Sequence, residues 1–471
     1  MNYHIVGIGG AGMSAVAHVL LDCGHHVSGS DMQQSSAWAP LQARGVPIVQ
    51  GHHADNVASD VDALVVTSAV KAPHPEIDAA QARNIPVLRR HDLWRMWSTQ
   101  RRIIAVAGTH GKTTTSAMIA YALEHAGMRP GYLIGAEVAA LPRSATWGDA
   151  DAPFVIEADE YDRTFLALQP DIAVITTLEW DHVDIYPTLT DYQAAFQQFV
   201  TQVAHPERVF VCGDDAGIRA TVTRPNVRWY GIDDRLAADP VACSRVPLDW
   251  SASSCQQQGA MQTFQAWHYD RRSFAMRLHQ PLQLMLQGLH NVRNALAAYA
   301  VAVTVGANPQ AVATALATFA GAKRRFEYKG CVADVTVIDD YAHHPTEVKA
   351  VLAAARQRYP GQRIIAYLQP HTYSRTAALV TEWRQAFGDA DVVYVGDIYA
   401  AREQPVPGVD APWLVGQIAH PQVQISGDLT KTVAHLVDAV RPGDVVVTMS
   451  AGDGTQIGPR LLHQLAESPH G

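Results

Sequence analysis

The chain has 471 residues, of which 48% are hydrophobic and 17% charged, and its formal net charge is −9. This length is too great for one hydrophobic core, so we expect two or three domains. The negative charge argues against nucleic acid as the main partner, and no apolar run is long enough to span a membrane. Because the chain also enters a strand directly, without a secretory signal, we expect a cytoplasmic protein. Its five scattered cysteines show no CxxC spacing, which is typical of a reduced protein.

Short apolar runs alternate with helical patterns, which predicts α/β domains built on mostly parallel sheets. In the first part of the chain we expect strands at residues 3–7, 26–29, 63–70 and 85–88 and a helix at 14–23. The segment around residues 92–100 is predicted to be a connector that ends this domain.

A second unit is expected to open with a strand at residues 102–107 and a helix at 113–126. It should continue with strands at 155–158, 172–176 and 209–212, antiparallel strands between 240 and 288, and a helix at 291–305. A third unit should contain strands at 335–338, 364–368, 392–395 and 445–449. We therefore predict three α/β domains, at residues 1–98, 99–320 and 321–471.

A glycine turn follows the first predicted strand. Gly7, Gly9 and Gly12 have the spacing G-x-G-x-x-G, and Asp31 ends the next strand. Such a turn binds a diphosphate at the amino end of a helix. NAD and UDP both supply a diphosphate, so these residues alone leave an NAD-dependent oxidoreductase open as an alternative.

A second glycine-rich turn, with the sequence Ala-Gly-Thr-His-Gly-Lys-Thr-Thr-Thr at residues 107–115, lies between a predicted strand and a predicted helix. Its backbone N–H groups and the helix terminus would face a phosphate, Lys112 would add a full positive charge, and the Thr113 hydroxyl could bind Mg²⁺. Val106 stands where the general pattern has a further glycine. The order of strand, glycine turn, lysine and helix predicts a site for ATP.

Four carboxylates occur within the six residues from Glu157 to Asp162, at the end of a predicted strand. They would repel one another unless cations compensate their charge. Mg²⁺ or Mn²⁺ bound together with ATP would supply that compensation.

The loop Gly-Thr-His-Gly-Lys-Thr-Thr at residues 108–114 resembles the phosphate loop of the Mur ligase family, whose members join amino acids to UDP-N-acetylmuramic acid. Other segments resemble the family too, and together they cover nearly the whole chain: residues 7–14, 29–31, 51–52, 67–69, 85–87, 157–160, 181–182, 290–298, 339–347 and 369–376. The resemblance implies a Rossmann-like first domain that holds UDP and does no redox chemistry. It also implies a central P-loop domain that binds ATP and a Rossmann-like C-terminal domain that binds an amino acid.

The resemblance also implies roles for individual residues. The UDP-sugar would be bound by Gly9, Gly10, Gly12, Met13, Ser14, Asp31, His52 and Ser68. ATP would be bound by Gly108, Thr109, His110, Gly111, Lys112, Thr113, Thr114, His290, Asn294, Arg324 and Arg325. The metal would be held by Thr113, Glu157 and His182, and the amino acid by Tyr341, His343 and Arg375. The candidates for catalysis are Lys112, His182, Arg325 and His343.

Residues 339–347 and 369–376 resemble the branch of the family that adds L-alanine, although Thr372 stands where a second arginine is commoner. The resemblance implies ATP-dependent joining of L-alanine to the carboxylate of UDP-N-acetylmuramate through an acyl phosphate, in peptidoglycan synthesis. A monomer or weak homodimer is expected. The nearest alternative is the ligase that attaches a recycled tripeptide to the same sugar, and a nucleotide-driven switch without synthesis is a more distant one.

Overall fold

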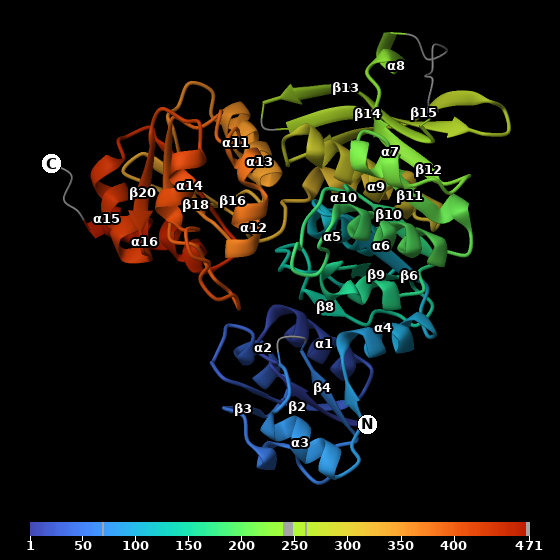
Figure 1. Cartoon of the computed structure of the whole chain (residues 1–471). Helices are drawn as coiled ribbons and strands as arrows, with labels where there is room; N and C mark the ends of the chain where they lie inside the picture. The colour runs from blue at the N-terminus through green and yellow to red at the C-terminus, as the bar shows by residue number, and fades with distance from the viewer. Residues whose placement is uncertain (68–69, 239–247, 260, 468–471) are drawn as a thin grey trace.

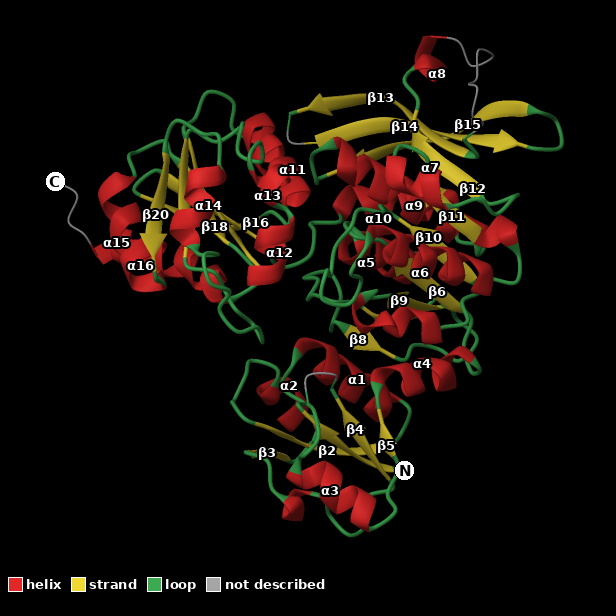
Figure 2. Cartoon of the chain, viewed as in Figure 1, coloured by secondary structure: helices red, strands yellow, loops and turns green. Residues whose placement is uncertain are grey.

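The computed structural model describes residues 1–67, 70–238, 248–259 and 261–467. The chain forms three α/β domains in sequence order, coloured blue, teal to yellow, and orange to red (Figure 1). Each domain has its own sheet with helices packed against it (Figure 2). The predicted fold class is therefore confirmed. Within these residues, no helix combines the length and the apolarity needed to cross a membrane.

The first domain has a five-stranded parallel sheet in the order β3-β2-β1-β4-β5. Its strands are β1 (Asn2–Val6), β2 (His26–Asp31), β3 (Ile48–Gln50), β4 (Ala63–Val66) and β5 (Val87–Leu88), and its helices are α1 (Ala11–Asp22), α2 (Trp38–Gln42) and α3 (Pro75–Ala82). The strand order reverses between β1 and β4. In open parallel sheets such a reversal leaves a crevice for a ligand at the carboxyl ends of the strands.

The central domain has a ten-stranded sheet in the order β15-β14-β13-β12-β11-β10-β6-β9-β7-β8. Its strands are β6 (Ile103–Ala107), β7 (Gly131–Leu133), β8 (Ala145–Thr146), β9 (Phe154–Glu157), β10 (Ile172–Ile175), β11 (Val209–Cys212), β12 (Arg228–Ile232), β13 (Trp250–Gln258), β14 (Met261–Asp270) and β15 (Ala275–Leu284). Its helices are α5 (Lys112–His125), α6 (Leu189–Gln202), α7 (Ala216–Thr221), α8 (Arg235–Ala238), α9 (Leu289–Thr304) and α10 (Pro309–Thr318). Every residue of β6 is buried and apolar, as expected for a parallel strand covered on both faces. The predicted antiparallel strands are confirmed as β13, β14 and β15.

The third domain has a six-stranded sheet in the order β16-β17-β21-β18-β19-β20, in which β16 and β17 pair antiparallel and the other neighbours pair parallel. Its strands are β16 (Glu327–Val332), β17 (Val335–Asp340), β18 (Ile364–Gln369), β19 (Val392–Gly396), β20 (Val423–Gly427) and β21 (Val445–Ser450). Its helices are α11 (Pro345–Arg358), α12 (Tyr373–Ala378), α13 (Val380–Trp383), α14 (Ala411–Gln417), α15 (Leu429–Ala439) and α16 (Ile457–Glu467).

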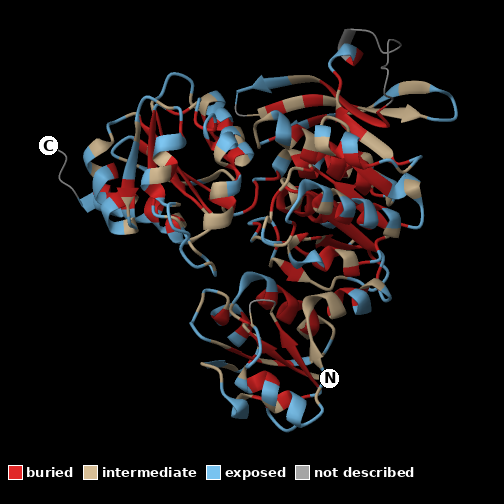
Figure 3. Cartoon of the chain, in the orientation of Figure 1, coloured by how far each residue is buried: buried red, intermediate tan, exposed pale blue. Residues whose placement is uncertain are grey.

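Buried residues, coloured red in Figure 3, lie along the sheets and in the helices that cover them. One continuous apolar core runs through the first and central domains, from Val16 in α1 to Leu296 in α9. The third domain has separate cores on the two faces of its sheet, around Ile364 and Ile365. The first two domains are thus joined by apolar packing, whereas the third packs around cores of its own.

The predicted connector at residues 92–100 is helical for most of its length, in α4 (Arg90–Ser98). The Asp92 carboxylate caps this helix by accepting a hydrogen bond from Arg89 N at 2.9 Å. Trp94 and Trp97 are spaced for one helical face and are both only 3% exposed. The Trp97 ring lies 5.9 Å from that of Trp147 in the central domain, so α4 is part of the packing that joins the two domains.

We predict that Trp97→Ala lowers the free energy of unfolding by about 3–5 kcal/mol, because it leaves a cavity where the first two domains meet. Denaturant unfolding followed by circular dichroism measures the change. Met96→Ala is the matched control, since Met96 is 38% exposed on the other side of the same helix and should cost under about 0.5 kcal/mol. Equal effects of the two substitutions would contradict this role for α4.

Candidate active site

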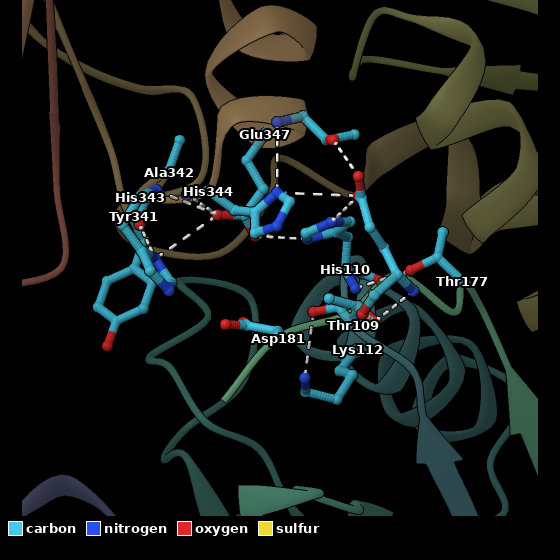
Figure 4. A network of polar contacts seen from close by, with 12 residues as sticks. Thr109, His110, Lys112, Thr177, Asp181, Tyr341, Ala342, His343, His344 and Glu347 are labelled. Atoms are coloured by element: carbon cyan, nitrogen blue, oxygen red, sulfur yellow. Dashed lines mark hydrogen bonds and ion pairs between the residues drawn. The ribbon is translucent and has the colours of Figure 1, made fainter. Parts of the chain in front are cut away.

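The site is built where parallel strands of the central sheet end. Strand β6 lies between β9 and β10, so the segments that follow these three strands meet at one edge of the sheet. They are the phosphate loop, the acidic segment 157–162 and the segment 176–182. Figure 4 shows residues 341–347 of the third domain beside the phosphate loop.

Two positions of the phosphate loop require glycine. Gly108 has φ +134°, and a Cβ there would collide with Thr176 Oγ1. Gly111 has φ +81°, and a Cβ there would lie 2.8 Å from Asn294 Oδ1. Asn294 of α9 therefore packs against the loop, beside the predicted ATP site. His290 lies at the exposed start of the same helix.

Lys112 is enclosed by oxygen atoms. Its Nζ donates hydrogen bonds to the carbonyls of Gly108 at 2.7 Å and Thr109 at 3.2 Å, and lies 2.9 Å from the Glu160 carboxylate. Burial alone would lower the pKa of Lys112, but the charges of Glu160 and Asp159 outweigh it and raise the pKa. The lysine therefore stays charged at the amino end of α5, where a phosphate would meet it.

The three predicted metal ligands lie in two groups. The Thr113 hydroxyl donates to Glu157 Oε1 at 2.8 Å, whereas His182 Nε2 lies 3.4 Å from Glu160 Oε1. Ligand atoms of Asp159, Glu160 and His182 are within 4.8 Å of one another. Burial raises the pKa of Glu157 despite the nearby charge of Lys112. Both groups lie close to Lys112, and each offers oxygen donors to a divalent cation.

The third domain contributes cations and an imidazole. Arg325 Nη2 donates to Thr113 Oγ1 at 3.2 Å, and the guanidinium groups of Arg324 and Arg325 lie 4.8 Å and 5.0 Å from the Tyr341 ring. His343 Nδ1 lies 2.9 Å from the Tyr341 carbonyl, which can only accept a hydrogen bond. Burial lowers the pKa of His343 to about 3, so its ring is neutral.

Arg375 is buried and already paired. Its Nε donates to Asp181 Oδ1 at 2.7 Å, its Nη1 donates to the His371 carbonyl at 3.1 Å, and its Nη2 lies 3.3 Å from His182 Nδ1. The predicted amino-acid ligand therefore connects the third domain to the central domain in this structure. Thr372, which stands where a second arginine is commoner, donates a hydrogen bond to the Glu403 carboxylate at 2.6 Å.

His110 of the phosphate loop lies between two carboxylates (Figure 4). Its Nε2 is 2.9 Å from Glu179 Oε2 in its own domain, and its Nδ1 is 3.0 Å from Glu347 Oε1 in the third domain. The Thr346 hydroxyl donates to the other oxygen of Glu179 at 2.7 Å. Burial alone would lower the pKa of His110, but the two carboxylates outweigh it and raise the pKa to about 9.

The sequence analysis gave no individual role to four acidic residues that hold this site together, although it included the first of them in the acidic segment expected to meet a metal: Glu160, Glu179, Asp181 and Glu347. Glu160, Glu179 and Asp181 follow the ends of β9 and β10, which was a usable signal. Glu347 ends the segment 339–347 that resembles the family, but its place in the first turn of α11 indicates a helix cap, and no contact with the central domain was predicted for it.

The glycine turn of the first domain precedes α1 as predicted. Met13 and Ser14 are buried, and their amides donate to the Gly10 carbonyl at 3.1 Å and 2.9 Å. Gly10 and Gly12 are exposed at the start of the helix. A ligand on this turn would therefore meet the glycines rather than the side chains of Met13 and Ser14.

Asp31 and His52 are held by the domain itself. The Asp31 carboxylate accepts a hydrogen bond from Gly9 N at 2.9 Å, which orders the glycine turn. His52 Nδ1 lies 3.1 Å from Ser30 Oγ and 3.4 Å from the buried Glu76 carboxylate. Ser68, the remaining predicted UDP ligand, lies outside the described residues.

Arg90, a residue that the sequence analysis did not select, lies between the glycine turn of the first domain and the acidic segment of the central domain. A Cβ on Gly12 would lie 3.6 Å from Arg90 Nη1, and the same atom is 4.0 Å from Asp159 Oδ2. It places a positive charge beside the glycine turn, where a diphosphate would need one.

Three family descriptions match successive parts of the chain. They are "Mur ligase family, catalytic domain" at residues 2–102, "Mur ligase middle domain" at 106–302 and "Mur ligase, glutamate ligase domain" at 324–452. The chain is 53% identical to the UDP-N-acetylmuramate–L-alanine ligase of Roseiflexus castenholzii, over 99% of this chain and 98% of that protein. It is also 53% identical to the ligase of the same name from Chloroflexus aggregans, over 98% of both chains.

Two solved structures share the whole architecture. The UDP-N-acetylmuramate-alanine ligase of Thermotoga maritima has a TM-score of 0.80 at 26% identity, over 99% of both chains. A murein peptide ligase from Psychrobacter arcticus has a TM-score of 0.72 at 27% identity, also over 99% of both chains.

The raised pKa of His110 predicts how stability depends on pH. The pKa rises from an ordinary 6.5 in the unfolded chain to about 9 in the folded protein, so the stabilisation is complete below pH 6.5 and lost as the pH passes 9. The stability advantage of the wild type over His110→Asn should shrink by up to about 3 kcal/mol across this range. Denaturant unfolding of both proteins between pH 6 and 10 measures it, and a difference independent of pH would contradict the assignment.

Proposed function

The chain belongs to the Mur ligase family, and we propose that it uses ATP to join L-alanine to the carboxylate of UDP-N-acetylmuramate in peptidoglycan synthesis. Relatives that are 53% identical over nearly their full length are named UDP-N-acetylmuramate–L-alanine ligase. The structural observation that supports the chemistry best is the charged Lys112 at the start of α5, on the side of the central domain where Figure 4 shows Tyr341 and His343 of the third domain.

The reaction requires two steps at one carboxylate. A carboxylate oxygen attacks the γ-phosphorus of ATP and ADP leaves, which gives an acyl phosphate. The amine of L-alanine then attacks the acyl carbon, and inorganic phosphate leaves as the amide forms. Lys112 and Arg325 would balance the charge of the phosphoryl group, and fixed charges of this kind stabilise the transition state without reorganisation.

We assign the proton transfer from the amine to His343. Because its Nδ1 donates to the Tyr341 carbonyl, its Nε2 keeps a lone pair that can accept a proton. Burial keeps the imidazole neutral, so this lone pair is free, but it also makes the ring a weak base. His343 would therefore take the proton only once the bond between nitrogen and carbon is forming, when the attacking nitrogen has become acidic. Arg375 would bind the carboxylate of L-alanine, in exchange for part of its pairing with Asp181.

The donors around Lys112 fit Mg²⁺ or Mn²⁺. The Thr113 hydroxyl and the carboxylates of Glu157, Asp159 and Glu160 are oxygen donors, which Mg²⁺ prefers, and the His182 imidazole also suits Mn²⁺. We propose Thr113, Glu157 and His182 as the residues that hold the ion. When bound, the ion would neutralise charge on the phosphates of ATP.

The first domain would hold the UDP moiety on its glycine turn, with Arg90 supplying positive charge toward the diphosphate. ATP and UDP-linked substrates place the reaction in the cytoplasm. A monomer or weak homodimer remains our prediction for the oligomeric state.

The acceptor is tested by measuring phosphate release with UDP-N-acetylmuramate while the acceptor is varied. We expect release with L-alanine and a much lower rate with the tripeptide L-alanyl-γ-D-glutamyl-meso-diaminopimelate. The tripeptide is the relevant rival because a murein peptide ligase shares the fold over 99% of both chains. Release that depends on the tripeptide alone would overturn the assignment.

Lys112→Ala should lower the rate of phosphate release by roughly 10²–10³-fold or more, because it removes a charge that faces the transferred phosphoryl group. Binding of UDP-N-acetylmuramate, followed by calorimetry, should survive. Lys431→Ala serves as the control, since that lysine is 71% exposed on the third domain. Near-normal release from Lys112→Ala would mean that ATP binds elsewhere.

A further inference from the structure

The third domain meets the phosphate loop and the neighbouring segment 176–182 through polar groups. Arg325 reaches Thr113, Thr346 reaches Glu179, and Glu347 reaches His110. The apolar cores of the third domain lie around its own sheet. The position of this domain against the loop therefore depends on a few directional contacts, each of which can be removed singly.

Glu347 differs from the other contacts because its two oxygens serve two loops. Oε1 lies 3.0 Å from His110 Nδ1 in the phosphate loop. Oε2 accepts hydrogen bonds from His343 N at 3.1 Å and His344 N at 3.2 Å, which fixes the loop that precedes α11 (Figure 4). That loop carries Tyr341 and His343, the side chains proposed for the amino acid.

The contact with His110 has a definite charge. Both ring nitrogens face carboxylates, Glu179 at 2.9 Å and Glu347 at 3.0 Å. Ionised carboxylates can only accept hydrogen bonds, so both nitrogens must carry protons and the ring is an imidazolium. The His110 amide is fixed as well, since it donates to Thr177 Oγ1 at 2.8 Å. His110 thus transmits the position of Glu347 rigidly to the backbone of the phosphate loop.

We propose that Glu347 is a positioning residue that couples the ATP site to the amino-acid site, acting through His110. Glu347 itself touches neither substrate. Glu347 holds His110 and the backbone of His343 and His344 at the same time. The position of the third domain that orders the phosphate loop for ATP is therefore also the position that orders the loop for L-alanine. This inference rests on the proposed function, because it takes the two loops to bind these two substrates.

Coupling of this kind is reciprocal. If ATP favours the linked arrangement, L-alanine must gain from bound ATP by the same factor that ATP gains from bound L-alanine. Removing the link at either end should therefore weaken the use of both substrates. A residue that only shaped its own loop would change the affinity for one substrate and leave the affinity for the other unchanged.

The test compares wild type, Glu347→Gln, His110→Asn and the double variant by steady-state phosphate release, with ATP and L-alanine varied in turn. Glu347→Gln keeps an oxygen that can accept from the His343 and His344 amides but loses the charge that pairs with His110. We expect each single variant to lower kcat/KM for both ATP and L-alanine by roughly 10- to 100-fold, as for the loss of a charge-assisted hydrogen bond. The double variant should be no worse than the poorer single variant.

Three measurements keep the result interpretable. The Glu347→Gln and His110→Asn proteins lose a stabilising ion pair and should melt somewhat below wild type while staying folded at the assay temperature, whereas Glu347→Ala, which also removes the helix cap, should melt lower still. The affinity for UDP-N-acetylmuramate should be unchanged. Glu382→Gln, on the exposed surface of α13, should match wild type in every respect.

Failure of the two proposals can be told apart. If wild type releases no phosphate with L-alanine, the proposed function is wrong. Three results with an active wild type would overturn the coupling role. The kcat/KM values of Glu347→Gln could stay within about twofold of wild type, or fall for one substrate only. The loss of kcat/KM in the double variant could also equal the product of the losses in the two single variants.

Discussion

Positive charge held at the amino end of α5 is the constraint on which the rest of the site depends. Lys112 is surrounded by Glu160 and two carbonyls of its own loop, with Glu157 and Asp159 nearby. So many oxygens at one helix terminus would be unfavourable without the lysine, and they are what a metal–ATP complex needs when it binds. The strands that carry them, β6, β9 and β10, are neighbours in the sheet, so the fold delivers these groups together.

The domains are joined in two different ways, and this difference suits a three-substrate reaction. The first domain shares an apolar core with the central domain, which fixes the glycine turn relative to the phosphate loop. The third domain instead meets the central domain at this site through Arg325, Arg375 and Glu347, whose contacts are polar. Apolar packing resists separation over a broad area, whereas a few hydrogen bonds can exchange with water and with substrates. The polar groups of the third domain can therefore exchange their contacts for a substrate without disturbing an apolar core.

Much of the fold and part of the site could be predicted because their signals are local. Strand, glycine turn, Lys112 and helix are adjacent in sequence, and so are the residues after β9 and β10. The pairing of His110 with Glu347 could not be predicted, since 237 residues separate them and nothing in either segment indicates contact with the other. Helix α4 was missed because its tryptophans are buried by packing against the central domain, which the local sequence does not reveal. The hydrogen bond by which the Asp31 carboxylate orders the glycine turn could not be predicted either, because it depends on backbone geometry that the sequence does not reveal.

The central claim is that the γ-phosphoryl group of ATP, held at the start of α5, meets the carboxylate delivered by the first domain. The most direct measurement uses UDP-N-acetylmuramate labelled with ¹⁸O in its carboxylate and follows the inorganic phosphate by mass spectrometry. Transfer through an acyl phosphate carries one labelled oxygen into each phosphate released, because the bridging oxygen leaves with phosphorus when the amine attacks. Unlabelled phosphate, released at the rate of amide formation, would contradict the account.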